Sequence, residues 1–214
     1  IERAYALYKS CKYIVENKIE GDFVECGVWQ GGSAMIMAYT LMSLNVYDRK
    51  IYLYDTFEGM SEPEDADIDL NENTAKSLLE ADKDKKGYVW AYAAEEEVKN
   101  NLFSTGYREE NLIFVKGKVE NTIPNIAPGK ISLLRLDTDW YASTCHELAY
   151  LYPRLVQSGI MIIDDYGHWI GSKKAVDESL EKESSKTWRQ KIEYKGGRIG
   201  KGRTRTEKNN KKRM

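Results

Sequence analysis

Acidic side chains follow four short apolar runs of this sequence: Glu25, Asp55, Asp137 and the pair Asp164-Asp165. Ionised carboxylates are costly to bury, so acids at the ends of apolar strands need partners. A single acid of this kind is usually a turn or helix-cap residue. Four of them at one edge of one sheet favour a binding site instead.

The strongest signal combines Asp137 with Asp164 and Asp165. If the two preceding strands are neighbours, the three carboxylates lie close together, and they repel one another unless a cation or protons intervene. Oxygen-only ligands favour a hard ion such as Mg²⁺, which usually retains open water positions. A Walker B acid of a nucleotide hydrolase is the alternative, but the chain contains no GxxxxGK[ST] loop.

A glycine-containing turn joins the strand that ends near Glu25 to a helix beginning at Ser33, and its Gly27 and Gly31 permit close approach of a ligand. The spacing does not form GxGxxG, and an acid at this strand end repels phosphate but attracts an ammonium group. Asp55 is placed to accept hydrogen bonds from ribose hydroxyls. Together these features predict a ligand with an amino acid at one end and a nucleoside at the other, as in S-adenosylmethionine. NAD is the competing interpretation, which the glycine pattern fits less well.

Strands alternate with helices along the chain, which predicts an α/β fold with a mostly parallel sheet and helices on both faces. Ligands bind beyond the carboxyl ends of such strands. Residues 57–110 form a long insertion of the kind that serves as a lid or binding loop, and its acidic stretch 58–69 is expected to be a solvated loop, with a mobile lid as the alternative. The expected strands are 23–28, 51–54, 112–115, 131–136 and 160–163, and the expected helices are 2–18, 33–44, 71–82, 93–104, 141–156 and 172–183.

Four stretches resemble the macrocin O-methyltransferase family of the tylosin pathway. They are 25–33 (ECGVWQGGS), 54–60 (YDTFEGM), 136–144 (LDTDWYAST) and 164–167 (DDYG), and their order and spacing match over about residues 1–195.

This resemblance implies a Rossmann-like class I methyltransferase fold, S-adenosylmethionine as the methyl donor and Mg²⁺ held by three acids. Carried over residue by residue, it makes Asp137, Asp164 and Asp165 the metal ligands, with Asp137 also a candidate general base. It places Glu25, Gly27, Ser33 and Asp55 along the cofactor.

Other residues near the expected site have two interpretations each. His168 is close enough in sequence to help remove the acceptor proton, because its ordinary pKa is near neutrality; the alternative is a loop histidine that points outward. Lys116 is expected to border the adenine pocket or to occupy a surface turn. Trp140, Tyr141 and Trp169 suit the apolar face of a sugar or phenol, or form a wall that excludes water.

Composition sets the remaining expectations. The apolar content of 42% is enough for a core, no apolar run is long enough to span a membrane, and three scattered cysteines suit a reducing cytoplasm. We expect one domain over residues 1–197, followed by a basic, flexible tail over 198–214 that has eight Lys/Arg and one Glu and needs no nucleic-acid partner.

The expected function is Mg²⁺-dependent O-methylation of a sugar or natural-product hydroxyl, with homo-oligomerisation left open. The alternatives are an NAD-dependent nucleotide-sugar oxidoreductase and a non-catalytic S-adenosylmethionine-binding module.

Overall fold

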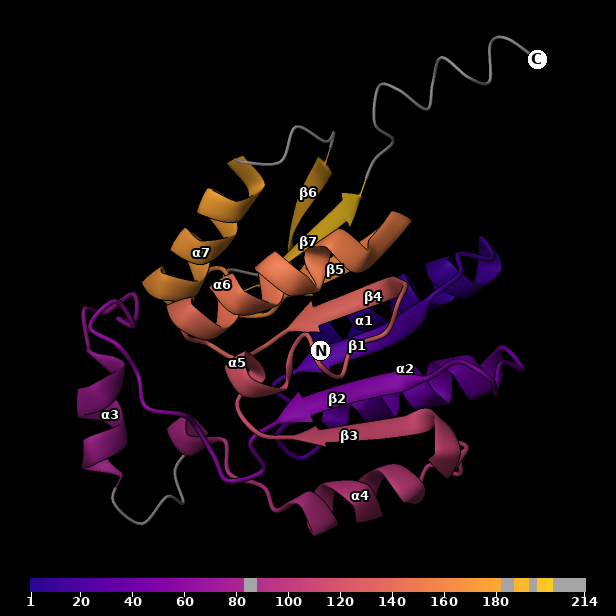
Figure 1. Cartoon of the computed structure of the whole chain (residues 1–214), viewed down its shortest axis with the longest axis horizontal. Coiled ribbons are helices and arrows are strands. Elements are labelled where there is room, and N and C mark those ends of the chain that lie inside the picture. Colours follow the sequence, from indigo (N-terminus) through magenta and orange to yellow (C-terminus); the bar gives the residue numbers. More distant parts are fainter. Residues whose placement is uncertain (83–87, 182–186, 193–195, 202–214) are drawn as a thin grey trace, which may run out of the picture.

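The computed structural model of the chain describes residues 1–82, 88–181, 187–192 and 196–201. Seven strands form a sheet in the order β3-β2-β1-β4-β5-β7-β6 (Figure 1). The first five strands are parallel, whereas β7 runs antiparallel to both β5 and β6. Their bounds are β1 Asp22–Cys26, β2 Ile51–Asp55, β3 Leu112–Lys116, β4 Ile131–Leu136, β5 Leu155–Ile163, β6 Thr187–Ile192 and β7 Gly196–Lys201.

Helices cover both faces of the sheet, as the alternating pattern predicts. Along β1, Phe23 joins the core cluster that includes α1, α2 and α4, and Val24 joins the cluster on the opposite face with α5, α6 and α7. Figure 1 shows α6 and α7 in front of the sheet and α1 and α2 behind it. The helices are α1 Glu2–Glu16, α2 Gly32–Ser43, α3 Ala75–Ala81, α4 Glu95–Phe103, α5 Val119–Thr122, α6 Tyr141–Tyr150 and α7 Ile170–Glu181.

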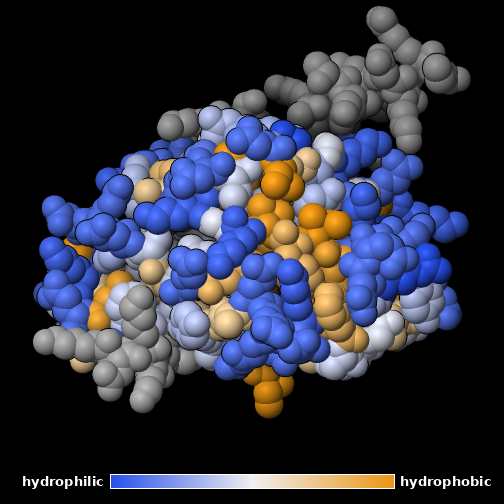
Figure 2. Space-filling view, turned by 60° about the horizontal axis from the view of Figure 1, so that its bottom comes forward, coloured by the Kyte–Doolittle hydropathy of each residue, from blue (hydrophilic) through white to orange (hydrophobic). Residues whose placement is uncertain are grey.

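The surface agrees with a fold that buries most of its apolar side chains. Viewed from the β3 edge, it is mainly hydrophilic, and its hydrophobic side chains gather in a central band (Figure 2). None of the helices in the described parts of the chain has the length and apolar character that a membrane crossing needs.

The strand order reverses at β1. The chain proceeds from β1 to β2 and β3 on one side, and then places β4 and β5 on the other. The loops that follow β1 and β4 therefore diverge, and open α/β sheets bind their ligands in the crevice at such a point. At the base of this crevice the pairing of β1 and β4 continues by one bond, since Asp137 N donates to Cys26 O at 2.8 Å.

The junction between α6 and β5 differs from the sequence prediction. The helix ends at Tyr150 instead of residue 156, and the strand begins at Leu155 instead of residue 160. A 3₁₀ turn over Tyr152–Arg154 separates them, and its Pro153 cannot continue a helix because it lacks an N–H group. Exposed polar residues at 157–158 interrupt the apolar run of the strand and hide its first half from pattern analysis.

The C-terminal edge of the sheet also differs. Residues through Lys201 form β7, so the expected domain boundary at residue 197 falls inside a strand. Ile199 packs into the core, and Arg198 Nη1 donates to Ser10 Oγ on α1 at 3.3 Å. The remainder of the predicted tail, residues 202–214, lies outside the described residues.

The insertion over residues 57–110 holds α3 and α4, and its first loop is fastened to the rest of the domain. The expected solvated stretch at 58–69 is exposed at Glu58, Glu62, Glu64 and Asp65 but not at its last two acids, because Asp67 and Asp69 are buried. Asp67 Oδ1 accepts from the backbone N–H of Tyr141 at 2.8 Å. A β-bridge joins Asp69 to Trp169. This loop therefore has specific attachments to the segments that follow β4 and β5.

Candidate active site

A cavity of about 540 Å³ opens at the carboxyl ends of β1, β2, β4 and β5. Strand register explains why these particular residues meet there. Cys26 pairs with Leu136, and Leu136 pairs with Ile163, so the residue after each strand arrives at the same level of the sheet edge. Those following residues include Asp137 and Asp164, which both line the cavity.

The structure brings together the three acids that the sequence proposes as metal ligands. Asp137, Asp164 and Asp165 each offer a carboxylate oxygen, and these atoms lie within 4.8 Å of one another. Asp165 is 8% exposed, and its Oδ2 is buried without a hydrogen-bond partner among the described residues. A buried acceptor without a partner is costly, and a cation in this cluster would satisfy it.

Arg135 is the residue that the sequence analysis missed. Its buried guanidinium lies at the centre of the acids: Nη1 donates to Glu25 Oε1 at 2.7 Å and to Asp137 Oδ2 at 2.8 Å. Nη2 donates to Asp164 Oδ1 at 2.8 Å. The available signal was a lone charged residue inside the apolar strand β4. Arg3, in the first turn of α1, makes a second ion pair with Asp164.

These surroundings shift the pKa values of the three acids in opposite directions. Burial would raise the pKa of Asp164, but the nearby guanidinium groups of Arg135 and Arg3 outweigh it and hold that pKa below its ordinary value. Burial raises the pKa of Asp137 well above its ordinary value despite Arg135, and neighbouring Asp165 raises it further. Burial likewise raises the pKa of Asp165, with a further contribution from Asp139.

The β2 end of the cavity is built by hydrogen bonds to the main chain. Asp55 Oδ2 accepts from the N–H groups of Val28 at 2.7 Å and Trp29 at 3.1 Å. Its Oδ1 accepts from Phe57 N at 2.7 Å. The carboxylate therefore shapes the loop after β1, and it remains at the cavity lining, where the sequence analysis places it.

The other residues expected along the cofactor divide into two groups. Gly27 and Ser33 line the cavity. Glu25, Gly31 and Lys116 are not among the described residues that line it. Glu25 lies beneath it, bonded to Arg135, and burial raises its pKa to about 7 although Arg135 opposes the shift.

Gly31 and Lys116 have other contacts. Gly31 has φ +85°, and a Cβ there would lie 3.3 Å from Val98 Cγ1, so this position serves the packing of α4. Lys116 forms an ion pair with Glu58 at 3.1 Å beside a smaller hollow of about 340 Å³. Gly117 and Lys118, the next two residues, do line the main cavity.

The aromatic residues form a wall on the β5 side. His168 and Trp169 line the cavity, and their rings meet edge to face at 5.1 Å between centroids. Trp140 is buried behind them, and its Nε1 donates to the carbonyl oxygen of Ser61 at 3.0 Å, which holds the insertion loop against this wall. Tyr141 Oη donates to Glu178 at 2.8 Å, which directs this side chain to α7.

The whole arrangement agrees with a match over nearly the entire described chain. The model of the macrocin-O-methyltransferase (TylF) family matches residues 2–197. The chain belongs to this family.

Two curated relatives of this TylF-family chain are O-methyltransferases by name. One is demethyldecarbamoylnovobiocin O-methyltransferase of Streptomyces niveus, to which the chain is 31% identical over 178 residues. The aligned region covers 83% of this chain and 65% of that protein. The chain is 31% identical over 159 residues to 8-demethyl-8-(2,3-dimethoxy-alpha-L-rhamnosyl)-tetracenomycin-C 4'-O-methyltransferase of Streptomyces olivaceus, covering 72% of this chain and 56% of that protein. The chain thus spans less than two thirds of the length of either relative.

A solved structure confirms the predicted fold. The O-methyltransferase NovP superposes with a TM-score of 0.80 at 27% identity, over 95% of this chain and 81% of that one. The TylF-family chain therefore has the Rossmann-like class I methyltransferase fold that its four motifs imply.

Proposed function

We propose that this chain is an S-adenosylmethionine-dependent O-methyltransferase that modifies a hydroxyl of a sugar or of a glycosylated natural product. The observation that carries the proposal is a single cavity with two different ends. One end is a glycine turn with Asp55, suited to an amino acid and a nucleoside. The other is the acid cluster of Asp137, Asp164 and Asp165. The family membership and the O-methyltransferase names of the two relatives support methyl transfer over the NAD-dependent alternative.

The donor end needs chain groups that recognise each part of S-adenosylmethionine. We assign the ribose to Asp55 and the amino-acid part to the loop from Gly27 to Ser33, where the N-terminus of α2 opens onto the cavity. The donor brings an already activated methyl group, so the protein's contribution is mainly orientation of the acceptor oxygen. Glu25 supports this end from below through Arg135.

The acceptor end fits a hard divalent cation such as Mg²⁺. The unpartnered Asp165 Oδ2 and the three carboxylates within 4.8 Å of one another supply an oxygen-only donor set. When bound there, Mg²⁺ would lower the pKa of a neighbouring acceptor hydroxyl. Asp137 and His168 both line the cavity and are the candidates to take the hydroxyl proton. Trp169 supplies an apolar part of the lining beside these groups.

The experiment measures donor binding and methyl transfer separately. Calorimetry with S-adenosylmethionine tests the donor end, and transfer from labelled donor to a panel of glycosylated natural products and simple phenols tests the activity. Chelation with EDTA should abolish transfer while donor affinity changes less than about twofold, and added Mg²⁺ should restore transfer. Full activity in excess EDTA would contradict the metal role. Donor binding without transfer to any acceptor would favour the non-catalytic module, and binding of NAD in place of S-adenosylmethionine would favour the oxidoreductase.

A further inference from the structure

We propose that Arg3 is an exchangeable counterion of the acid cluster: it pairs with Asp164 when the cluster holds no divalent cation, and it leaves Asp164 when one binds. Arg3 is thus a positioning residue that acts through Asp164. This inference rests on the proposed function, because it concerns how the proposed metal site is filled.

The first observation is that arginines occupy both oxygens of Asp164. Arg135 donates to Oδ1 at 2.8 Å, and Arg3 pairs with Oδ2. A divalent cation that uses Oδ2 would face the Arg3 guanidinium at close range, in a partly buried region where like charges are poorly screened. Cation and guanidinium therefore compete for the same carboxylate.

The second observation is that the two arginines are held very differently. The Arg135 side chain is 9% exposed and bonds to three carboxylates from three strand ends. Its removal would leave several buried charges without a partner. The Arg3 side chain is 37% exposed and belongs to the first turn of α1. An arginine that already reaches solvent can leave its partner at much lower cost. Arg3 is therefore the one that yields.

The exchange also affects the shape of the cavity. Ile1, Ala4 and Leu7 line the cavity beside Arg3 and belong to the same end of the chain. The ion pair with Asp164 fastens this wall to the end of β5. Because cation binding would release the pair, metal occupancy and the Arg3–Asp164 ion pair are coupled through one carboxylate, and each weakens the other.

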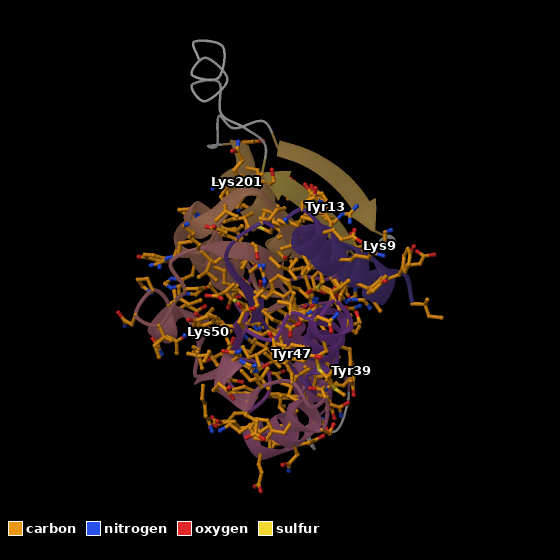
Figure 3. The ribbon with its side chains drawn as sticks, turned by 90° about the vertical axis from the view of Figure 1, so that its right-hand side faces the viewer. Lys9, Tyr13, Tyr39, Tyr47, Lys50 and Lys201 are labelled. Atoms are coloured by element: carbon orange, nitrogen blue, oxygen red, sulfur yellow. The ribbon has the colours of Figure 1, made fainter. Side chains whose placement is uncertain are left out.

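The test measures binding of Mn²⁺, without acceptor or turnover, by calorimetry and by electron paramagnetic resonance. Arg3→Met should bind Mn²⁺ about threefold or more tightly than the wild type, and Arg3→Lys, which keeps the charge, should stay near the wild type. Lys9→Met is the matched control, since it removes one positive charge from the same helix. Figure 3 shows Lys9 on the right-hand side of the molecule as seen in Figure 1, toward the amino ends of the parallel strands. Its Mn²⁺ affinity should change less than about twofold.

The outcomes separate this inference from the proposed function. If Arg3 only supports the fold, Arg3→Met should bind Mn²⁺ equally or more weakly, and that result in a folded variant would overturn the exchange. Arg3→Gln decides the question if Arg3→Met does not fold, because it keeps a donor to Asp164 without the charge. If neither the wild type nor any variant binds Mn²⁺ while S-adenosylmethionine still binds, the proposed metal site is wrong and the exchange fails with it.

Discussion

The two ends of the cavity hold their carboxylates in opposite ways. At the end of β2, Asp55 is bound by three main-chain N–H groups, which are fixed in number and charge. At the ends of β4 and β5, Asp137 and Asp164 accept from Arg135, and Asp165 lies close to both of them. Main-chain donors cannot titrate or leave, whereas protons, arginines and cations can replace one another. The three N–H groups therefore fix the Asp55 carboxylate in place, and we expect the carboxylates at the ends of β4 and β5 to respond to pH and to a bound cation.

Asp137→Asn should have the largest effect and should confine it to the acceptor end. The substitution keeps the shape but removes one negative charge and a candidate base, so methyl transfer should fall by about 10²- to 10⁴-fold. Affinity for S-adenosylmethionine, measured by calorimetry, should change less than about threefold. Asp65→Asn, at an exposed position of the insertion, is the control. An equal loss at both ends would show that the two ends are not independent.

Asp55→Ala should act on the donor end alone. It removes the acceptor of three N–H groups and the proposed ribose ligand, so binding of S-adenosylmethionine should weaken by about 1–3 kcal/mol. Mn²⁺ affinity should stay at the wild-type value. Calorimetry with both ligands checks this, and unchanged donor affinity would remove Asp55 from the cofactor site.

Glu25→Gln tests the residue that connects the two ends, since Glu25 lies on β1 but bonds to Arg135 on β4. Its pKa is raised to about 7, so the folded state binds its proton more tightly than the unfolded state does. The stabilisation is complete below the ordinary pKa and is lost as pH rises through about 7. The unfolding free energy of the wild type relative to Glu25→Gln should therefore fall by roughly 1–3 kcal/mol between pH 5 and pH 8. Thermal melts across this range measure it, and a constant difference would refute the raised pKa.

The smallest expected effect concerns the insertion loop. Trp140→Phe keeps the aromatic contact but loses the hydrogen bond to Ser61, which is worth about 1 kcal/mol. Amide hydrogen exchange should become faster within residues 57–73 and stay unchanged in β1. Adding S-adenosylhomocysteine should slow exchange in this loop if it closes over the cofactor, and equal exchange with and without the ligand would make it an ordinary loop.

The sequence predicts the acid cluster because strand ends at one edge of a parallel sheet follow from local pattern. The role of Arg135 could not be predicted from the sequence because it depends on Glu25 and Asp164, which are distant in sequence and meet only in the folded sheet. The burial of Asp67 could not be predicted for the same reason, since its partner is the backbone N–H of Tyr141. Local composition at 58–69 predicts a solvated loop, and only the tertiary contacts show that Asp67 and Asp69 are buried within it.

β7 was missed because its sequence carries little strand signal. Glycines and basic residues surround Ile199, so the side chains give little indication of a strand. The backbone hydrogen bonds of β7 come from its pairing with β5 and β6.

The loop after β1 constrains which parts of the cavity can change. Gly27 has φ +81°, and a Cβ there would lie 2.1 Å from the carbonyl oxygen of Asp137. The loops after β1 and β4 therefore meet backbone to backbone, and their separation does not depend on the side chains around them. Lining residues outside these loops, including Leu78 and Val89, can vary without moving them, whereas a single methyl group at Gly27 would force the two loops apart.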